Sequence, residues 1–301
     1  MGPMDVTIVE VSPRDGLQNE AVVLPTEAKV ELIGRLVAAA ARRVEAVSFA
    51  HPRLVPAMAD AEAVMERVPR ADGVSYAGLV LNRRGLDRAL DSGVDEVNVV
   101  VCVSETFSRR NQNASTGESM LAAAEVIQRA RAEGLFTTLT LATSFGCPFE
   151  GEVDPGRVVE LATEGAAAGV HELCLADTIG AGVPSQVRDL VARARDAVGA
   201  EPPLRFHFHN TRNTGFANAV TAVELGARVL DASAGGIGGC PFAPRATGNI
   251  ATDDLVFLLE RMGLDTGWDL DALVPTADFL GARLGHEVPA LVPRAGPFPP
   301  A

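Results

Sequence analysis

The stretch AAGVHELCLAD, residues 167–177, ends a helix-like segment with small residues and a glycine and continues directly into an apolar run typical of a buried strand. The same order of helix, glycine and strand is found three more times, in DSGVDEVNVVV (91–101), AEGLFTTLTLA (132–142) and ELGARVLDAS (224–233). Glycine is favoured just after a helix because it adopts a positive φ without a steric penalty from a Cβ atom. The chain is therefore expected to alternate helices and strands. The glycines predicted to end helices are Gly93, Gly134, Gly169 and Gly226.

Signals for the beginnings of helices support this alternation. Asp154 and Pro155 provide an N-cap and a first-turn proline, which predicts a helix beginning at Pro155. Ser115 followed by Glu118 is typical of a capping box. A further helix is expected near 27–42, where apolar residues recur at helical spacing.

The number of strand-like runs decides between the possible α/β architectures. Eight alternating units in a chain of this length fit a closed (β/α)8 TIM barrel better than a doubly wound sheet, and no GxGxxG motif follows the first run. We predict one domain over 1–301, with the barrel over about 5–265. A C-terminal helical extension over 266–290, with a helix near 269–284, and a proline-rich tail over 291–301 are expected to follow. The predicted strands are 5–11, 44–49, 74–80, 95–102, 136–144, 170–176, 204–209 and 228–233.

The composition limits the functional classes. The net charge of −13 argues against a general nucleic-acid-binding protein. There is no apolar run of roughly 18 residues and no basic-then-apolar leader, so we expect no membrane association and a cytoplasmic location. The four cysteines form no CxxC pair and are too few for a disulfide scaffold, as in a protein of a reducing compartment.

Polar residues gather where the predicted strands end. In TIM barrels the carboxyl ends of all strands meet at one mouth, where catalytic groups are found. The convergence of polar residues from several strands predicts an active site there. These residues are Arg14, Asp15 and Gln18 after the first strand, Glu45 and Ser48 in the second, Asp177 and Thr178 at the end of the sixth, His207 and His209 in the seventh, and Asn249 after the eighth.

The motif HFH, residues 207–209, predicts a metal site. Side chains two residues apart on a strand point to the same face, so both imidazoles project together. With Asp15 as a carboxylate and Asn249 as an amide ligand, the donor set suits Mg²⁺ or Mn²⁺, with Co²⁺ or Zn²⁺ as alternatives. The alternative interpretation is that His207 and His209 are polar barrel residues hydrogen-bonded to their neighbours.

Other candidates also have structural interpretations. Arg14 and Asp15 could form a surface turn, and Asp177 could cap the following helix. Glu45 would be costly to bury unpaired, so a salt bridge to Arg14 is expected, and that bridge could orient the arginine. Cys240 follows GGIGG, which predicts a thiol on a mobile loop over the mouth that could act as a general acid or base.

Several motifs together resemble the 3-hydroxy-3-methylglutaryl-CoA lyases, which are metal-dependent TIM-barrel lyases related to isopropylmalate synthase. The resemblance extends over about 5–285. The motifs that carry it, in chain order, are VEVSPRDGLQNE (9–20), CVSETFSRRNQN (102–113), SFGCPFEG (144–151), LADTIGAGVP (175–184), HFHNT (207–211) and GGIGGCPFAPRATGNIATDDLVFLL (235–259).

The resemblance implies a role for each matching residue. The metal ligands would be Asp15, His207, His209 and Asn249. Arg14 would stabilise an enolate, Cys240 would move its proton, and His207 or a neighbouring acid residue is the candidate base. Asp253 stands where the family usually has glutamate. The expected catalytic residues are Arg14, Glu45, Asp177, His207 and Cys240. The expected substrate-binding residues are Arg14, Gln18, Ser48, Asp177 and Thr178, and Asp253 is expected to support the site.

The implied reaction is cleavage of 3-hydroxy-3-methylglutaryl-CoA to acetoacetate and acetyl-CoA, as in leucine catabolism, by a homodimeric enzyme. The alternatives are a lyase for citramalyl-CoA or a longer 3-alkyl-3-hydroxyglutaryl-CoA, a condensing transferase, or a non-catalytic barrel that binds acyl-CoA. Departures from the family pattern that could alter the substrate are Asn210, Arg212, Asn213 and Arg245.

Overall fold

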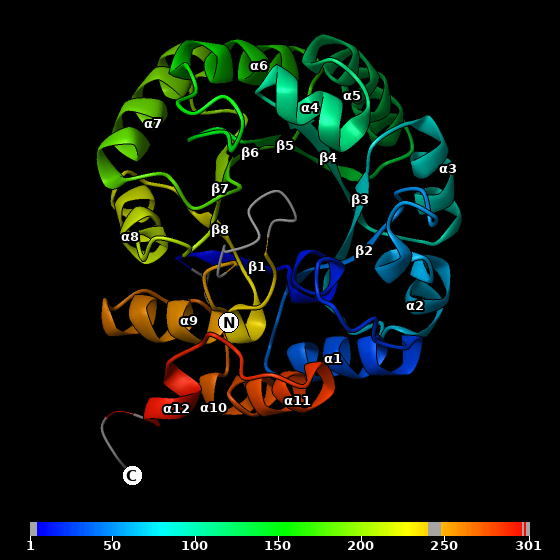
Figure 1. Ribbon diagram of the computed structural model, residues 1–301, viewed down its shortest axis with the longest axis vertical. Coiled ribbons are helices and arrows are strands. Elements are labelled where there is room, and N and C mark those ends of the chain that lie inside the picture. Colours follow the sequence, from blue (N-terminus) through cyan, green and yellow to red (C-terminus); the bar gives the residue numbers. More distant parts are fainter. Residues whose placement is uncertain (1–4, 240–247, 297, 299–301) are drawn as a thin grey trace.

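Eight parallel strands form a closed barrel in a computed structural model that describes residues 5–239, 248–296 and 298. Each strand pairs with the next in the chain, and β8 pairs with β1 to complete the circle (Figure 1). The predicted (β/α)8 TIM barrel is confirmed. The strands are β1 (Thr7–Glu10), β2 (Arg43–Ser48), β3 (Ser75–Val80), β4 (Glu96–Cys102), β5 (Phe136–Ala142), β6 (Glu172–Asp177), β7 (Leu204–Phe208) and β8 (Val229–Ala232).

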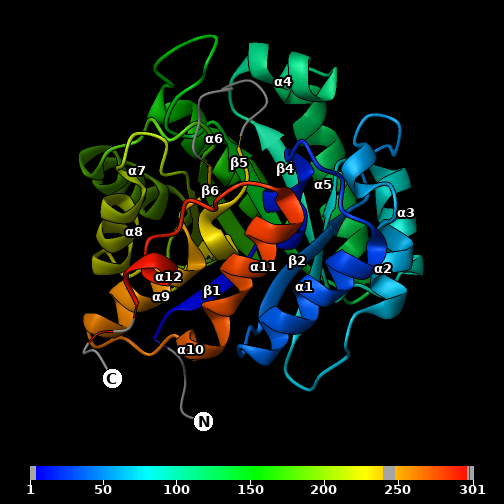
Figure 2. The ribbon, with the colours of Figure 1, turned by 60° about the horizontal axis from the view of Figure 1, so that its bottom comes forward.

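Helices surround the barrel and bury its apolar outer face. Helices α10 and α11 pack against α1, on the side of the molecule where the first and last parts of the barrel meet (Figure 2). No described helix is long and apolar enough to cross a membrane. The helices are α1 (Thr26–Ala38), α2 (Ala61–Arg67), α3 (Arg83–Asp91), α4 (Glu105–Gln112), α5 (Thr116–Ala132), α6 (Pro155–Ala167), α7 (Pro184–Val198), α8 (Gly215–Glu224), α9 (Thr252–Arg261), α10 (Leu270–Leu273), α11 (Pro275–Leu284) and α12 (Val292–Ala295). Short helical turns are η1 (Ser12–Gly16), η2 (Pro56–Met58) and η3 (Ala234–Gly236).

Two predicted helices differ from the observed ones. The first ends at Ala38 rather than near 42, because Ala40 adopts a positive φ of 68°. The helix expected near 269–284 is two helices, since Pro275 has no N–H to continue the hydrogen-bond ladder and instead begins α11. The tail also contains the short helix α12.

The predicted caps are present. The Asp154 side chain accepts from the backbone N–H of Gly156, and Ser115 and Glu118 form a reciprocal capping box. All four predicted glycines after helices have positive φ values, between 66° and 89°. These local signals fix where each helix ends and thereby where the next strand enters the barrel.

Two glycine substitutions separate the effect of a positive φ from that of side-chain packing. Gly134 has a φ of 84°, and no atom lies within 4 Å of a Cβ built there, as is also true of helical Gly34. We expect Gly134→Ala to lower the free energy of unfolding by about 1–2 kcal/mol through backbone strain alone. Gly34→Ala should instead raise it by roughly 0.5–1 kcal/mol. Denaturant unfolding measures both, and equal signs would contradict the assignment of strain to Gly134.

Candidate active site

A cavity at the carboxyl end of the barrel gathers most of the predicted site residues. Its wall is formed by side chains from many strands and from the loops that follow them. Asn249, Glu45 and Asp177 do not line it. The predicted residues that do are Arg14, Asp15, Gln18, Ser48, Thr178, His207 and His209.

Asp15, His207 and His209 form a cluster with the geometry of a metal site. One ligand atom from each of the three lies within 4.8 Å of those of the others. The turn η1 directs Asp15 over the end of β7, where its Oδ2 lies 4.0 Å from His207 Nε2. The two imidazole rings project from the same face of β7, and their centroids are 5.1 Å apart.

Asn249 lies next to this cluster and is hydrogen-bonded to it. Its amide nitrogen donates to Asp15 Oδ2 at 2.9 Å and to the carbonyl of Ile237 at 3.1 Å. Its oxygen Oδ1 is buried and has no hydrogen-bond partner among the described residues, and the same is true of His209 Nδ1. Unpaired buried acceptors are costly. A carboxylate beside unpaired amide and imidazole acceptors therefore fits a divalent cation.

The electrostatics hold two members of this cluster in forms that can bind a cation. Burial raises the pKa of Asp15, but the Arg14 guanidinium and the two imidazoles outweigh it and bring the pKa to about 2. Burial and the neighbouring His207 lower the pKa of His209 to about 3. At neutral pH, Asp15 is thus a carboxylate and His209 a neutral imidazole with a free lone pair.

His207 has a carboxylate partner behind it. Its Nδ1 lies 3.0 Å from Asp231 Oδ2, so that Nε2 faces Asp15. Burial lowers the pKa of His207, but the hydrogen bond to Asp231 and the charges of Asp15 and Asp231 outweigh it, and the pKa is raised. Burial raises the pKa of Asp231, and Arg205 and His207 more than compensate, so the pKa is lowered. Asp231 is therefore a hydrogen-bond acceptor only.

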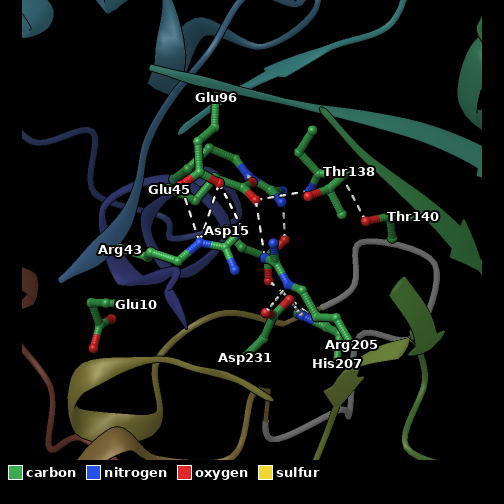
Figure 3. Close-up of polar contacts among 12 residues, drawn as sticks. Glu10, Asp15, Arg43, Glu45, Glu96, Thr138, Thr140, Arg205, His207 and Asp231 are labelled. Carbon is green, nitrogen blue, oxygen red and sulfur yellow. Dashed lines mark hydrogen bonds and ion pairs between the residues drawn. The ribbon is translucent and has the colours of Figure 1, made fainter. Parts of the chain in front are cut away.

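Beneath the cavity the barrel is filled by a charge network rather than by apolar side chains alone (Figure 3). Arg14 donates to Glu45 through Nε and to Asp15 at 2.7 Å through Nη1, as the predicted salt bridge requires. Three guanidinium groups face five carboxylates, leaving two unbalanced negative charges when every carboxyl is ionised and His207 is neutral. A bound dication would balance them. The members are Arg14, Asp15, Arg43, Glu45, Glu96, Glu172, Arg205, His207 and Asp231.

The position of Asp177 does not support the predicted catalytic and substrate-binding role. Both carboxylate oxygens accept backbone N–H groups of the following loop, from Ala181 and Gly182 at 2.9 Å each. In β6, Glu172 joins the network inside the barrel and Ala176 lines the cavity, so the next residue, Asp177, points to the other side. Asp177 therefore holds the loop before α7 and is not the cap of that helix, whose N-cap position is Val183.

The structure describes two further residues that the sequence analysis connected with the site, Arg212 and Glu45, but not Cys240 and Arg245. The guanidinium of Arg212 donates to the carbonyls of Ile179 and Gly180 at 3.0 and 2.9 Å, so it fastens a loop instead of reaching into the cavity. Glu45 lies behind the cavity wall, where it accepts from two residues that line the cavity, Arg14 and Asn98. Cys240 and Arg245 lie outside the described residues.

Asp253 supports the site from outside the cavity. Its Oδ2 accepts from the backbone N–H of Gly235 at 2.7 Å, and its Oδ1 is buried without a partner among the described residues. Glu10 accepts from Ala234 in the same turn at 3.0 Å. Glu10 lies apart from the charge network in Figure 3. The carboxyl groups of Asp253 and Glu10 hold η3, which directly precedes the segment predicted to form the loop with Cys240.

Asp253 should make the stability of the protein depend on pH. Burial raises its pKa from 3.8 to about 7. Protonated Asp253 stabilises the folded protein fully at pH values below the pKa that this carboxyl has in the unfolded chain. This stabilisation is lost as the pH rises through the pKa in the folded protein. Relative to wild type, Asp253→Asn should therefore gain stability between about pH 4 and pH 7, by at most on the order of 4 kcal/mol. Melting temperatures across this range test it.

The adjacent Asp254 supplies the control for this measurement. Its carboxylate accepts from the backbone N–H groups of Leu291 and Val292. Asp254→Asn removes a carboxylate from the same turn of α9 and so controls for the loss of a charge at this place in the fold. A pH-independent difference between Asp253→Asn and wild type would show that Asp253 is ionised in the folded protein.

Sequence reasoning missed several polar residues inside the barrel. The Asn98 side chain donates to Glu45 at 2.8 Å and accepts from Thr140 at 2.7 Å. Asn98, Thr140 and Asp231 all line the cavity. The detectable signal was the one used for Glu45, a polar side chain inside an apolar strand run. Arg205 had a second signal, because it precedes His207 and His209 at the same two-residue spacing.

The fold and the cavity place the chain among the TIM-barrel enzymes, whose active sites lie at the carboxyl end of the barrel. Within that class, the sequence profile of the HMGL-like family matches residues 5–280, and the chain belongs to this family. The chain is 43% identical to the (R)-citramalyl-CoA lyase of Chloroflexus aurantiacus, with 98% of this chain and 96% of that protein covered. It is also 43% identical to the hydroxymethylglutaryl-CoA lyase YngG of Bacillus subtilis, with 96% of each covered.

A solved relative shows the same fold. The HMG-CoA lyase of Acinetobacter baumannii, determined in complex with coenzyme A and 3-methylmalate, matches with a TM-score of 0.94 at 38% identity, over 99% of this chain and 98% of that one. The resemblance read from the sequence motifs is thus confirmed, and the protein is a carbon–carbon lyase.

Proposed function

We propose that this protein cleaves 3-hydroxy-3-methylglutaryl-CoA to acetoacetate and acetyl-CoA. The observation that carries the proposal is the placement of Arg14 directly beside the Asp15, His207 and His209 cluster in one cavity. The Bacillus subtilis relative named for this activity and the coenzyme A complex of the Acinetobacter relative support it.

Four residues would hold the divalent cation. Their oxygen and imidazole donors suit Mg²⁺ or Mn²⁺, with Co²⁺ and Zn²⁺ as alternatives. They are Asp15, His207, His209 and Asn249. When bound, the cation supplies Lewis-acid polarisation of the C3 hydroxyl and a carboxylate oxygen of the substrate. His207 has only Nε2 available toward the cavity, so we assign it to the ligand role in place of the predicted base.

Arg14 stabilises the charge that develops on cleavage. The C3 hydroxyl gives its proton to a neighbouring acid residue, for which Asp15 in the cavity is the candidate. As the C2–C3 bond breaks, the resulting C3 alkoxide becomes the ketone of acetoacetate, and the electron pair passes into the enolate of acetyl-CoA. Glu45 and Asp15 fix the guanidinium through Nε and Nη1, and no described residue accepts from Nη2. This preorganised donor can meet the thioester oxygen. Cys240, outside the described residues, would then protonate the enolate carbon.

A related substrate is the second candidate. The citramalyl-CoA lyase of Chloroflexus aurantiacus is as similar in sequence as the Bacillus enzyme. In citramalyl-CoA the carboxylate is attached directly to the carbon that bears the hydroxyl. Cleavage would then give acetyl-CoA and a 2-oxo acid, whereas 3-hydroxy-3-methylglutaryl-CoA gives a 3-oxo acid. The two reactions share Arg14 and the cation ligands, and the second product distinguishes them.

The test is to incubate the purified chain with each thioester and Mn²⁺ or Mg²⁺, with and without chelator, and to identify both products. We expect chelator-sensitive release of acetyl-CoA and acetoacetate. A 2-oxo acid from citramalyl-CoA alone would replace the first candidate by the second. Condensation without cleavage, or binding without turnover, would overturn both.

We further propose a cytoplasmic homodimer that acts in leucine catabolism and has one domain over the whole chain. Sedimentation should give twice the chain mass of 31.4 kDa. Thermal unfolding should show one cooperative transition. A monomer, or two separate transitions, would contradict these two assignments.

A further inference from the structure

The geometry points to Arg205 and Asp231 as positioning residues that fix the tautomer of His207 and so present its Nε2 as a ligand. This inference rests on the proposed function, because it concerns a residue assigned there to the cation. Neither residue was singled out from the sequence, and Arg205 does not line the cavity.

The contacts form a directed chain of three buried side chains. Arg205 donates through Nε to Asp231 Oδ1, and Asp231 Oδ2 lies 3.0 Å from His207 Nδ1. Because an ionised carboxylate only accepts, the hydrogen between Asp231 and His207 resides on Nδ1. The other nitrogen, Nε2, is thereby left with its lone pair toward Asp15. Figure 3 shows Arg205, Asp231 and His207 in contact with one another.

Arg205 fixes the orientation of the side chain at position 231. A guanidinium carries donors and no acceptor, so the atom of residue 231 that faces Nε must be an acceptor. Arg205 is itself fully buried, and its Nη1 pairs with Glu172 at 3.3 Å. It therefore has no solvent-exposed alternative conformation at this position, and Asp231 is held in one orientation.

Asp231→Asn follows as a diagnostic variant. With Arg205 in place, the amide oxygen must face Nε, and the amide NH₂ group must face His207. Nδ1 then becomes an acceptor and the ring hydrogen moves to Nε2, which can no longer bind a cation. Second-sphere changes of this kind cost on the order of 10–100-fold in metal affinity, and we expect Asp231→Asn to weaken Mn²⁺ binding by at least that factor.

Removing Arg205 from the same variant should restore binding in part. In Arg205→Met with Asp231→Asn, no donor fixes the amide, so its oxygen can turn toward Nδ1. The carboxylates that lose Arg205 keep other partners, Arg43 for Glu172 and Arg14 for Glu45. A purely structural role predicts the opposite order, with the double variant weaker than the single one.

Glu172→Gln is the matched control. Glu172 is a buried carboxylate that pairs with Arg205 and Arg43, and no contact joins it to His207. This variant removes one network charge, as Asp231→Asn does, so both share any loss of Mn²⁺ affinity caused by charge alone, and the loss in Glu172→Gln should be much smaller than that in Asp231→Asn. A loss as large as that of Asp231→Asn would assign the effect to general disruption of the network and overturn the proposal.

Two measurements decide the question independently of turnover. Calorimetric titration with Mn²⁺ gives the affinities of wild type and the three variants. Nitrogen NMR of the histidine-labelled, metal-free chain at mildly alkaline pH gives the tautomer of His207, whose signal is identified by its loss in His207→Gln. We expect the hydrogen on Nδ1 in wild type and on Nε2 in Asp231→Asn.

The outcomes separate the inference from the proposed function. If wild type binds no Mn²⁺, the proposed cation site fails, while the NMR spectra still decide the tautomer. If Asp231→Asn keeps the wild-type tautomer, or binds Mn²⁺ as wild type does, the positioning role is overturned even though the cation site stands.

Discussion

Replacing Arg14 with methionine is expected to lower kcat for acyl-CoA cleavage by on the order of 10²–10³, with a much smaller change in KM. Methionine keeps an unbranched apolar stem but removes the guanidinium group that meets the developing charge. Since that charge exists mainly in the transition state, the loss should fall on kcat. Glu45 would still accept from Asn98, which limits the cost to the fold. Steady-state kinetics with saturating Mn²⁺ and 3-hydroxy-3-methylglutaryl-CoA measure the effect.

Arg43 provides the matched comparison for Arg14. It belongs to the same network and pairs with Glu96 and Glu172, but it does not line the cavity. Arg43→Met should lower the melting temperature while kcat stays near the wild-type value. If Arg14→Met retained kcat within about tenfold of wild type, its proposed role in stabilising the enolate would be wrong.

Asp15→Asn should abolish tight Mn²⁺ binding and lower turnover by about 10³ or more, which corresponds to several kcal/mol of lost electrophilic stabilisation. Asp15 is the anionic member of the donor set, since Asn249 is an amide and His209 a neutral imidazole. Asparagine preserves the size of the side chain but not its charge. Mn²⁺ titration and product release measure the two effects separately.

Asp177→Asn distinguishes a cation ligand from any buried carboxyl near the mouth. The two carboxylate oxygens of Asp177 accept from backbone N–H groups. In the asparagine variant the side-chain NH₂ group would face one of these N–H groups, and we expect this loss of a hydrogen bond to lower the stability. Mn²⁺ affinity should be retained. Equal loss of Mn²⁺ binding in Asp177→Asn and Asp15→Asn would refute the assignment of Asp15 as a specific ligand.

The fold could be predicted because its signals are local. Each glycine such as Gly169 ends a helix through its own backbone preference, and each apolar run has the length of a strand. Eight such units leave few topologies. The grouping of Asp15 with His207 and His209 could also be predicted, because a closed barrel brings all strand ends to one mouth.

What could not be predicted depends on which face of a strand each residue occupies. Asp177 was placed in the site because it ends a strand, but alternation from Glu172 directs it outward. In β2 the alternation itself shifts, since the pairing with β3 is irregular between Glu45 and Val47. Ser48 thus lines the cavity although it has the opposite parity to Glu45. Such shifts arise from the pairing of strands, which no single segment encodes.

The pairing of β1 with β8 also sets an order of events when the protein is made. Asp15 emerges from the ribosome early, whereas its partner Asn249 emerges more than two hundred residues later. The proposed cation would not find its full set of ligands until the last strand had closed on the first. A nascent chain would therefore have to close its barrel before it could load the cation, and the bound cation would then join the two ends of the chain.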